Sequence, residues 1–81
     1  MLKQLNEVVV GETCIIKTVG GEGKIRRRLF DMGVTPGAHV YVRKVAPLGD
    51  PVEVTIRGYE LTLRKDEAKL ITVMIIEGDA K

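Results

Sequence analysis

Apolar and polar side chains alternate with period two through the second half of the chain. The apolar positions of this alternation are Val40, Val42, Val52, Val54, Ile56, Tyr59, Leu61 and Leu63. A period of two places all of them on one face of an antiparallel sheet, over a single core. We therefore expect strands over residues 39–43, 52–57 and 59–64, with a tight reversal at Gly58 and with Tyr59 on the inward face.

The first half of the chain predicts one strand and one helix. Residues 13–19 are short and rich in β-branched side chains, which is typical of a strand. From Lys24 onward Ile25, Leu29 and Met32 recur at helical spacing, so we expect a helix that turns these three side chains toward the core. Gly33 suits the left-handed position just past a helix end, and residues 35–37 (TPG) predict a turn.

The last part of the chain predicts a single helical turn over residues 65–69, a strand over residues 71–76 and a frayed end from residue 77 to residue 81. If the strand turns Ile71 and Val73 inward, then Met74 and Ile76 face out. These two side chains then form a partner-docking surface or an edge for strand addition. Alternatively, residues 8 and 9 cover them, which we expect because a thin core benefits from an extra layer.

Together these elements predict a mainly β fold. It has about five antiparallel strands, one α-helix in the first long connection and a short helical turn before the last strand. The 81 residues are enough for one domain, over residues 1–81. An open sheet would leave two edges exposed, and a small chain removes them by curling the sheet into a barrel. The short turn between the last two strands favours an SH3-like barrel.

Side chains that could perform chemistry are few. The sequence contains no Ser, and its one imidazole, His39, has no acid spaced to orient it, so we expect no enzyme. Cys14 and His39 lie on separate predicted strands and cannot supply the three or four ligands of a transition-metal site. We expect no metal in the monomer, with His39 as an adventitious ligand shared between chains at most.

The glycine-rich segment over residues 20–24 (GGEGK) lies between a strand and a helix, where a phosphate can bind free N–H groups. The P-loop pattern fails, however, because Thr18 stands in place of its first Gly and Ile25 follows Lys24. Arg26 likewise occupies the third Gly of a dinucleotide fingerprint. We therefore expect no bound nucleotide and no cofactor.

Charge is nearly balanced, with 13 Lys and Arg against 11 Asp and Glu, and it clusters only over residues 24–28 (KIRRR). Helical geometry puts Arg26, Arg27 and Phe30 on the outer side of the predicted helix, with the ring near both guanidinium groups. Arg and aromatic side chains are frequent in binding hot spots, so these three form a candidate partner-docking face. Alternatively, the ring packs under the glycine-rich segment and the arginines are merely solvated.

Four segments in this order resemble the FeoA family. They are residues 28–37 (RLFDMGVTPG), 46–51 (APLGDP), 56–61 (IRGYEL) and 63–68 (LRKDEA). The likeness runs from about residue 5 to residue 73. It implies an SH3-like barrel without catalytic residues, which assists bacterial ferrous iron uptake beside the FeoB permease, a membrane protein with a GTPase domain.

The resemblance thus implies a regulatory module that contacts an FeoB-type permease at the inner face of the cell membrane. One Cys, no signal-peptide pattern and no apolar run near about 18 residues also favour a cytoplasmic location. Two alternatives remain open: a transition-metal-associated barrel related to the C-terminal domain of DtxR-type repressors, and a nucleic-acid-binding barrel. Aromatic residues make up only 4% of the chain, so we expect no nucleic acid as a partner, while weak self-association stays open.

Overall fold

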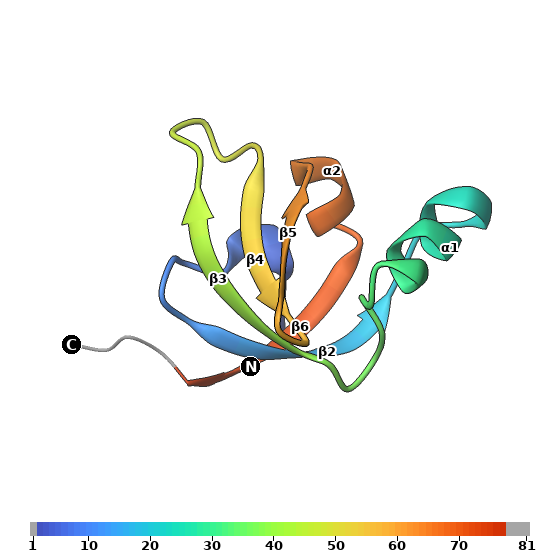
Figure 1. The fold of residues 1–81 in the computed structure, drawn as a ribbon, viewed down its shortest axis with the longest axis horizontal. Helices are drawn as coiled ribbons and strands as arrows, with labels where there is room; N and C mark the ends of the chain where they lie inside the picture. The colour runs from blue at the N-terminus through green and yellow to red at the C-terminus, as the bar shows by residue number, and fades with distance from the viewer. Residues whose placement is uncertain (1, 78–81) are drawn as a thin grey trace.

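The computed structural model describes residues 2–77, and in them six antiparallel strands form one strongly curved sheet (Figure 1). The strands are β1 (Leu2–Gln4), β2 (Thr13–Val19), β3 (His39–Val45), β4 (Val52–Ile56), β5 (Tyr59–Leu63) and β6 (Ile71–Glu77). Their order across the sheet is β1-β6-β2-β3-β4-β5. A 3₁₀ helix, η1 (Leu5–Glu7), follows β1, and the two α-helices are α1 (Gly23–Asp31) and α2 (Lys65–Ala68). The mainly β fold, the helix in the first long connection and the helical turn before the last strand are confirmed.

The strands bury alternate side chains, as the period of two predicts. In β4 the three apolar side chains are at most 2% exposed, and the polar side chains between them are half-buried. The core consists of aliphatic side chains and one thiol. Its fully buried members include Leu5, Cys14, Ile16, Leu29, Val34, Val40, Val42, Val54, Leu63, Ala68, Ile71 and Val73.

Two tight connections follow the expected turn chemistry. Ala38 N–H donates to the Thr35 carbonyl oxygen over 3.0 Å, with Pro36 and Gly37 between them and Gly37 at φ 92°. This is the arrangement of a type II turn. Residues 57 and 58 both have positive φ, at 52° and 84°, so they form the two-residue type I′ turn that suits the twist of a β-hairpin.

Strand β6 is an interior strand of the sheet, which excludes the alternative in which it offers an edge for strand addition. It pairs with β2 on one side and with β1 on the other, where Leu2 lies opposite Met74. The sixth strand went unpredicted because three residues are too few to display an alternation. Val8 is 4% exposed and joins the core, whereas Val9 is 58% exposed, so these two residues do not form the buried layer that we expected over the outer face of β6. Residue 77 belongs to β6, and the rest of the expected frayed end lies outside the described residues.

Two side chains expected in the core are exposed. Tyr59 is 73% exposed at the start of β5, an edge strand of the sheet, although it pairs with the buried Ile56 of β4. The last residue of β5, Leu63, is fully buried. Helix α1 projects from one end of the molecule, so only its C-terminal turn lies on the barrel (Figure 1). Ile25, in its N-terminal half, is therefore 47% exposed although it lies on the same helical stripe as Leu29.

Candidate functional site

The C-terminal end of helix α1 is held on the barrel by apolar contacts. Leu29 is fully buried, and Phe30 and Met32 are partly buried against the core. The helix ends in a Schellman motif: Gly33 N–H donates to the Phe30 carbonyl oxygen over 3.0 Å, and Val34 N–H donates to the Leu29 carbonyl oxygen over 2.9 Å. Gly33 has φ 91°, which confirms the left-handed residue predicted just past the helix.

Charged side chains also fix the position of α1. Arg28 Nη1 lies 2.6 Å from Glu67 Oε2, and the other carboxylate oxygen of Glu67 accepts a hydrogen bond from Arg64 N–H over 2.9 Å. Only 10% of the Glu67 side chain is exposed, so the ion pair bridges α1 and a partly buried position in α2. The sequence pattern did not predict this ion pair. The spacing of three residues between Arg64 and Glu67, typical of a helix N-terminus, was the available signal for Glu67.

The hairpin between β4 and β5 reaches the segment that follows α1. Arg57 donates from Nη2 to Thr35 Oγ1 over 2.9 Å and from Nε to the Gly33 carbonyl oxygen over 3.5 Å. The C-terminal end of α1 is thus held from two sides, by α2 through Glu67 and by the hairpin through Arg57. The N-terminal half of the helix is left projecting into solvent.

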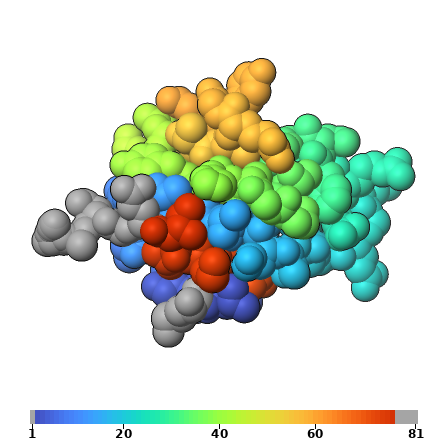
Figure 2. Space-filling model, turned by 90° about the horizontal axis from the view of Figure 1, so that it is seen from below, coloured from blue at the N-terminus to red at the C-terminus, as the bar shows by residue number. Residues whose placement is uncertain are grey.

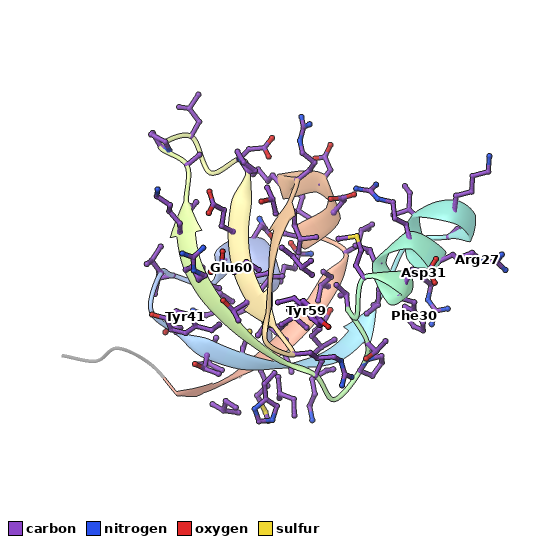
Figure 3. All side chains as sticks on the ribbon, in the orientation of Figure 1. Arg27, Phe30, Asp31, Tyr41, Tyr59 and Glu60 are labelled. Carbon is purple, nitrogen blue, oxygen red and sulfur yellow. The ribbon has the colours of Figure 1, made fainter. Side chains whose placement is uncertain are left out.

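The three predicted docking residues of α1 lie together around one surface hollow, whose lining is Gly23, Arg26, Arg27, Phe30 and Asp31. Figure 3 labels Arg27, Phe30 and Asp31 at the right of the molecule, away from the body of the sheet. The Arg26 guanidinium carbon lies 4.6 Å from the centre of the Phe30 ring, which is cation–π geometry. Arg26 Nε also donates to the Val19 carbonyl oxygen over 3.1 Å. Phe30 is therefore neither fully outward nor buried under the glycine-rich segment.

The hollow, lined by these five residues, carries more positive than negative charge. Among the side chains that the structure describes, those of residues 2–76, no carboxylate lies within 4.0 Å of a guanidinium nitrogen of Arg26 or Arg27. Asp31 lies one helical turn after Arg27, and the two side chains do not form an ion pair with each other in the described structure. The hollow thus presents two unneutralised cations, an aromatic ring and a single carboxylate.

The other two predicted docking residues lie elsewhere. Met74 is half-buried and Ile76 is 46% exposed, and both belong to β6. Met74 lies opposite Leu2 of β1 and Ile15 of β2, so it belongs to the outer face of the sheet. Figure 2 shows the end of β6 far from α1, which lies at the opposite side of that view. The structure does not join the two halves of the predicted docking set into one surface.

Cys14 and His39 do not converge. They lie on neighbouring strands, but Cys14 pairs with Val40 whereas His39 pairs with Ile15, so the two side chains face opposite sides of the sheet. The Cys14 thiol is buried and donates to the Val40 carbonyl oxygen over 3.7 Å. Burial, with a smaller effect of the Glu12 charge, raises the pKa of Cys14 to about 11, so the thiol is protonated at neutral pH.

The described residues contain no group of three or more His, Cys, Asp and Glu side chains that could hold a metal ion. They also contain no helix that is long and apolar enough to span a bilayer.

Comparison with known proteins identifies the family. The model of the FeoA domain matches residues 3–75. An Fe(2+) transport protein A/Fe(2+) transporter FeoB fusion protein of Porphyromonas gingivalis is 36% identical over 77 residues. That alignment covers 95% of this chain but only 9% of the fusion protein, so the chain corresponds to a small part of it.

Solved structures agree with the family match. A FeoA-like protein from Clostridium acetobutylicum is 38% identical, with a TM-score of 0.86 and coverage of 96% of this chain and 91% of that one. FeoA of Stenotrophomonas maltophilia, complexed with zinc and described as a prokaryotic SH3 domain protein, is 27% identical. Its TM-score is 0.77, with coverage of 91% of this chain and 89% of that one.

A further solved structure has a similar fold. IdeR of T. acidophilum has a TM-score of 0.83 over 93% of this chain and 34% of its own, at 22% identity, which is a likeness of fold alone. The relation to the barrels of iron-dependent repressors is thus confirmed as one of architecture. The family match over residues 3–75 and the sequence identity to FeoA proteins establish more than a shared fold. They show that the chain belongs to the FeoA family.

Proposed function

We propose that this chain, as a single domain over residues 1–81, is a non-enzymatic accessory module of ferrous iron uptake that contacts an FeoB-type permease. The observation that carries the proposal is the Porphyromonas gingivalis protein in which an FeoA part and an FeoB part are fused. Fusion keeps two domains at a high effective concentration, so it favours even a weak contact between them.

The proposed contact is made at the inner face of the cell membrane and involves no chemistry by this chain. The proposal assigns it no cofactor, nucleotide, nucleic acid or metal of its own. Docking alters the permease only if it binds one of the permease's conformational states more tightly than the other. The proposed role is therefore a bias on the GTPase cycle or the gate of the permease.

The hollow on α1 is the surface that best supports this role. It combines Arg side chains with an aromatic ring, which are the residue types most frequent in binding hot spots. It also lies on a helix that projects from the barrel, where a partner can reach it without disturbing the core (Figure 1). Met74 and Ile76 belong to a separate face and are proposed only as a second contact.

The test is a pull-down with the purified chain as bait. The cytoplasmic part and the membrane part of the permease are offered separately, each with GDP, with a non-hydrolysable GTP analogue and without nucleotide. We expect one part to be retained, more strongly in one nucleotide state. Replacing Arg26, Arg27 and Phe30 together by Ala should abolish retention, whereas Tyr59→Ala, at an exposed ring outside the hollow, should not.

Retention of neither part in any nucleotide state would refute the proposed function. Unchanged retention of the triple variant would refute the surface and leave the function standing. A circular dichroism spectrum of each variant checks that the fold is intact.

A further inference from the structure

The hollow on α1 contains hydrogen-bond donors that the fold does not use. The Arg26 guanidinium stacks on Phe30 and donates from Nε to the Val19 carbonyl oxygen. Stacking occupies the face of the guanidinium and leaves its edge available. Its two Nη groups donate no hydrogen bond to any residue over the range 2–76, where side chains are described. The stacked ring and the Val19 contact therefore orient a guanidinium edge toward an oxygen ligand and reduce the entropy lost when that ligand binds.

Arg27 adds a second guanidinium to the same hollow and forms no ion pair with any side chain that the structure describes. Arg28, next in the sequence, differs because Glu67 already neutralises it. The fold thus satisfies one of three consecutive arginines and leaves two for an external acceptor. Carboxylates bind guanidinium edges in bidentate geometry, which gives orientation as well as affinity.

Asp31 limits which anions fit. It lines the hollow four residues after Arg27, about 6 Å farther along the helix axis. A polyanion such as RNA or an anionic lipid surface would place negative charge against this carboxylate as well as against the arginines. A ligand with one anionic group and one cationic group avoids that repulsion. The chain's net charge of +2 also provides little general attraction for a polyanion.

We infer that the hollow on α1 binds a protein segment of mixed charge, in which a Glu or Asp side chain meets Arg26 and Arg27 while a Lys or Arg side chain meets Asp31. An apolar group of the same segment packs on Phe30. This inference rests on the proposed function, since it specifies the chemistry of the permease segment that docks there. The order of the charged residues along α1 sets the orientation of the bound segment. Its acidic group lies toward the N-terminal end of α1 and its basic group toward the C-terminal end.

The experiment measures the affinity of three charge variants for the part of the permease that wild type retains. Arg27→Glu should weaken binding by about tenfold or more. Asp31→Lys should also weaken it, by about fivefold, because the basic group of the segment loses its partner. Lys24→Glu is the matched control: it makes the same change of charge on an exposed part of the same helix but outside the hollow, and we expect less than about a twofold effect.

Asp31→Lys distinguishes a mixed-charge segment from a polyanion. If the hollow binds a polyanionic surface, removing the carboxylate strengthens binding, and that result would overturn the inference. Unchanged binding by Arg27→Glu would overturn it as well, although the permease contact itself would still stand. A vesicle with anionic lipid and a short RNA are tested in parallel, and binding of either one that depends on Arg27 would also contradict the inference.

A second measurement keeps the inference testable if the permease does not bind at all. A synthetic helical peptide with Glu and Lys four residues apart and a Leu between them is titrated into the ¹⁵N-labelled chain. We expect amide shifts over residues 23–31 that disappear when the Glu of the peptide is replaced by Gln. Shifts elsewhere only, or none at about 1 mM peptide, would reject the hollow as a mixed-charge site independently of the permease.

Discussion

Leu29 and Ile25 lie four residues apart on one stripe of α1, yet the structure predicts very different consequences for their truncation. Leu29 is fully buried among the core side chains, whereas Ile25 is 47% exposed where the helix projects from the barrel. The comparison of Leu29→Ala with Ile25→Ala therefore measures how the helix that carries the candidate site is attached. Both variants remove aliphatic carbons and introduce the best helix-forming residue.

The expected magnitudes follow from burial. Leu→Ala at a fully buried site loses the transfer free energy of the removed carbons and leaves a cavity, so we expect Leu29→Ala to lower the free energy of unfolding by about 3 kcal/mol. At Ile25 about half of the side chain is already in water, which leaves about 1 kcal/mol to lose, and the better helix propensity of Ala returns part of it. We expect a net loss of about 0.5 kcal/mol.

Urea unfolding followed by circular dichroism measures both losses. A chain of this size has a free energy of unfolding of roughly 4–12 kcal/mol, so Leu29→Ala should remain folded. In a separate thermal unfolding experiment its midpoint temperature should lie about 12–24 °C below that of the wild type. Equal losses for the two variants would show that the whole length of α1 lies on the barrel. A loss under about 1 kcal/mol for Leu29→Ala would show that the helix is not held by the core at all.

Three further predictions concern the contacts around the site and the buried thiol. A double-mutant cycle between Arg28→Ala and Glu67→Gln should give a coupling energy of about 1 kcal/mol. The value is modest because 59% of the Arg28 side chain is exposed. A coupling energy of zero at low salt would contradict the ion pair. Gly33→Ala should lower the free energy of unfolding by about 1–2 kcal/mol through its φ of 91°, and an unchanged urea midpoint would contradict the Schellman ending. The pKa of Cys14 in the folded chain, about 11, lies above that of an unfolded thiol, so the stability that this group contributes is complete below about pH 9 and is lost as the pH rises toward 11. Wild type should therefore lose more stability than Cys14→Ala between these pH values in urea titrations, and parallel curves would refute the assignment.

The sequence predicted those parts of the fold that depend on local pattern. The alternation through β4 and the reversal expected at Gly58 specify a hairpin, and Gly33 marks the end of α1, although Arg57, expected in the strand, belongs to the turn. Features that depend on what lies opposite a segment were missed. Ile25 and Leu29 are equivalent in helical spacing, but only the barrel's extent decides which of them is covered.

The candidate site was predicted in the same partial way. Helical spacing brought Arg26, Arg27 and Phe30 to one region, and the structure places them around one hollow. The sequence did not indicate that Asp31 supplies the negative charge of that hollow. A spacing of four residues allows an ion pair between Asp31 and Arg27, and only the structure shows that the pair does not form. The alternation of β6 turned Met74 and Ile76 outward, but it carries no information about their distance from α1. Nothing local marked Glu67 as the partner of Arg28, since 39 positions separate them in the sequence.

We propose that this chain acts by contact through helix α1, and an NMR titration distinguishes that surface from every other. The ¹⁵N-labelled chain is titrated with the cytoplasmic part of an FeoB-type permease, and the amide shifts are mapped onto the structure. We expect the largest shifts on residues 23–31 and on the neighbouring Val19, whose carbonyl oxygen accepts the Arg26 hydrogen bond. Saturable binding with shifts confined to β5 or to the outer face of β6, while α1 stays unperturbed, would contradict it.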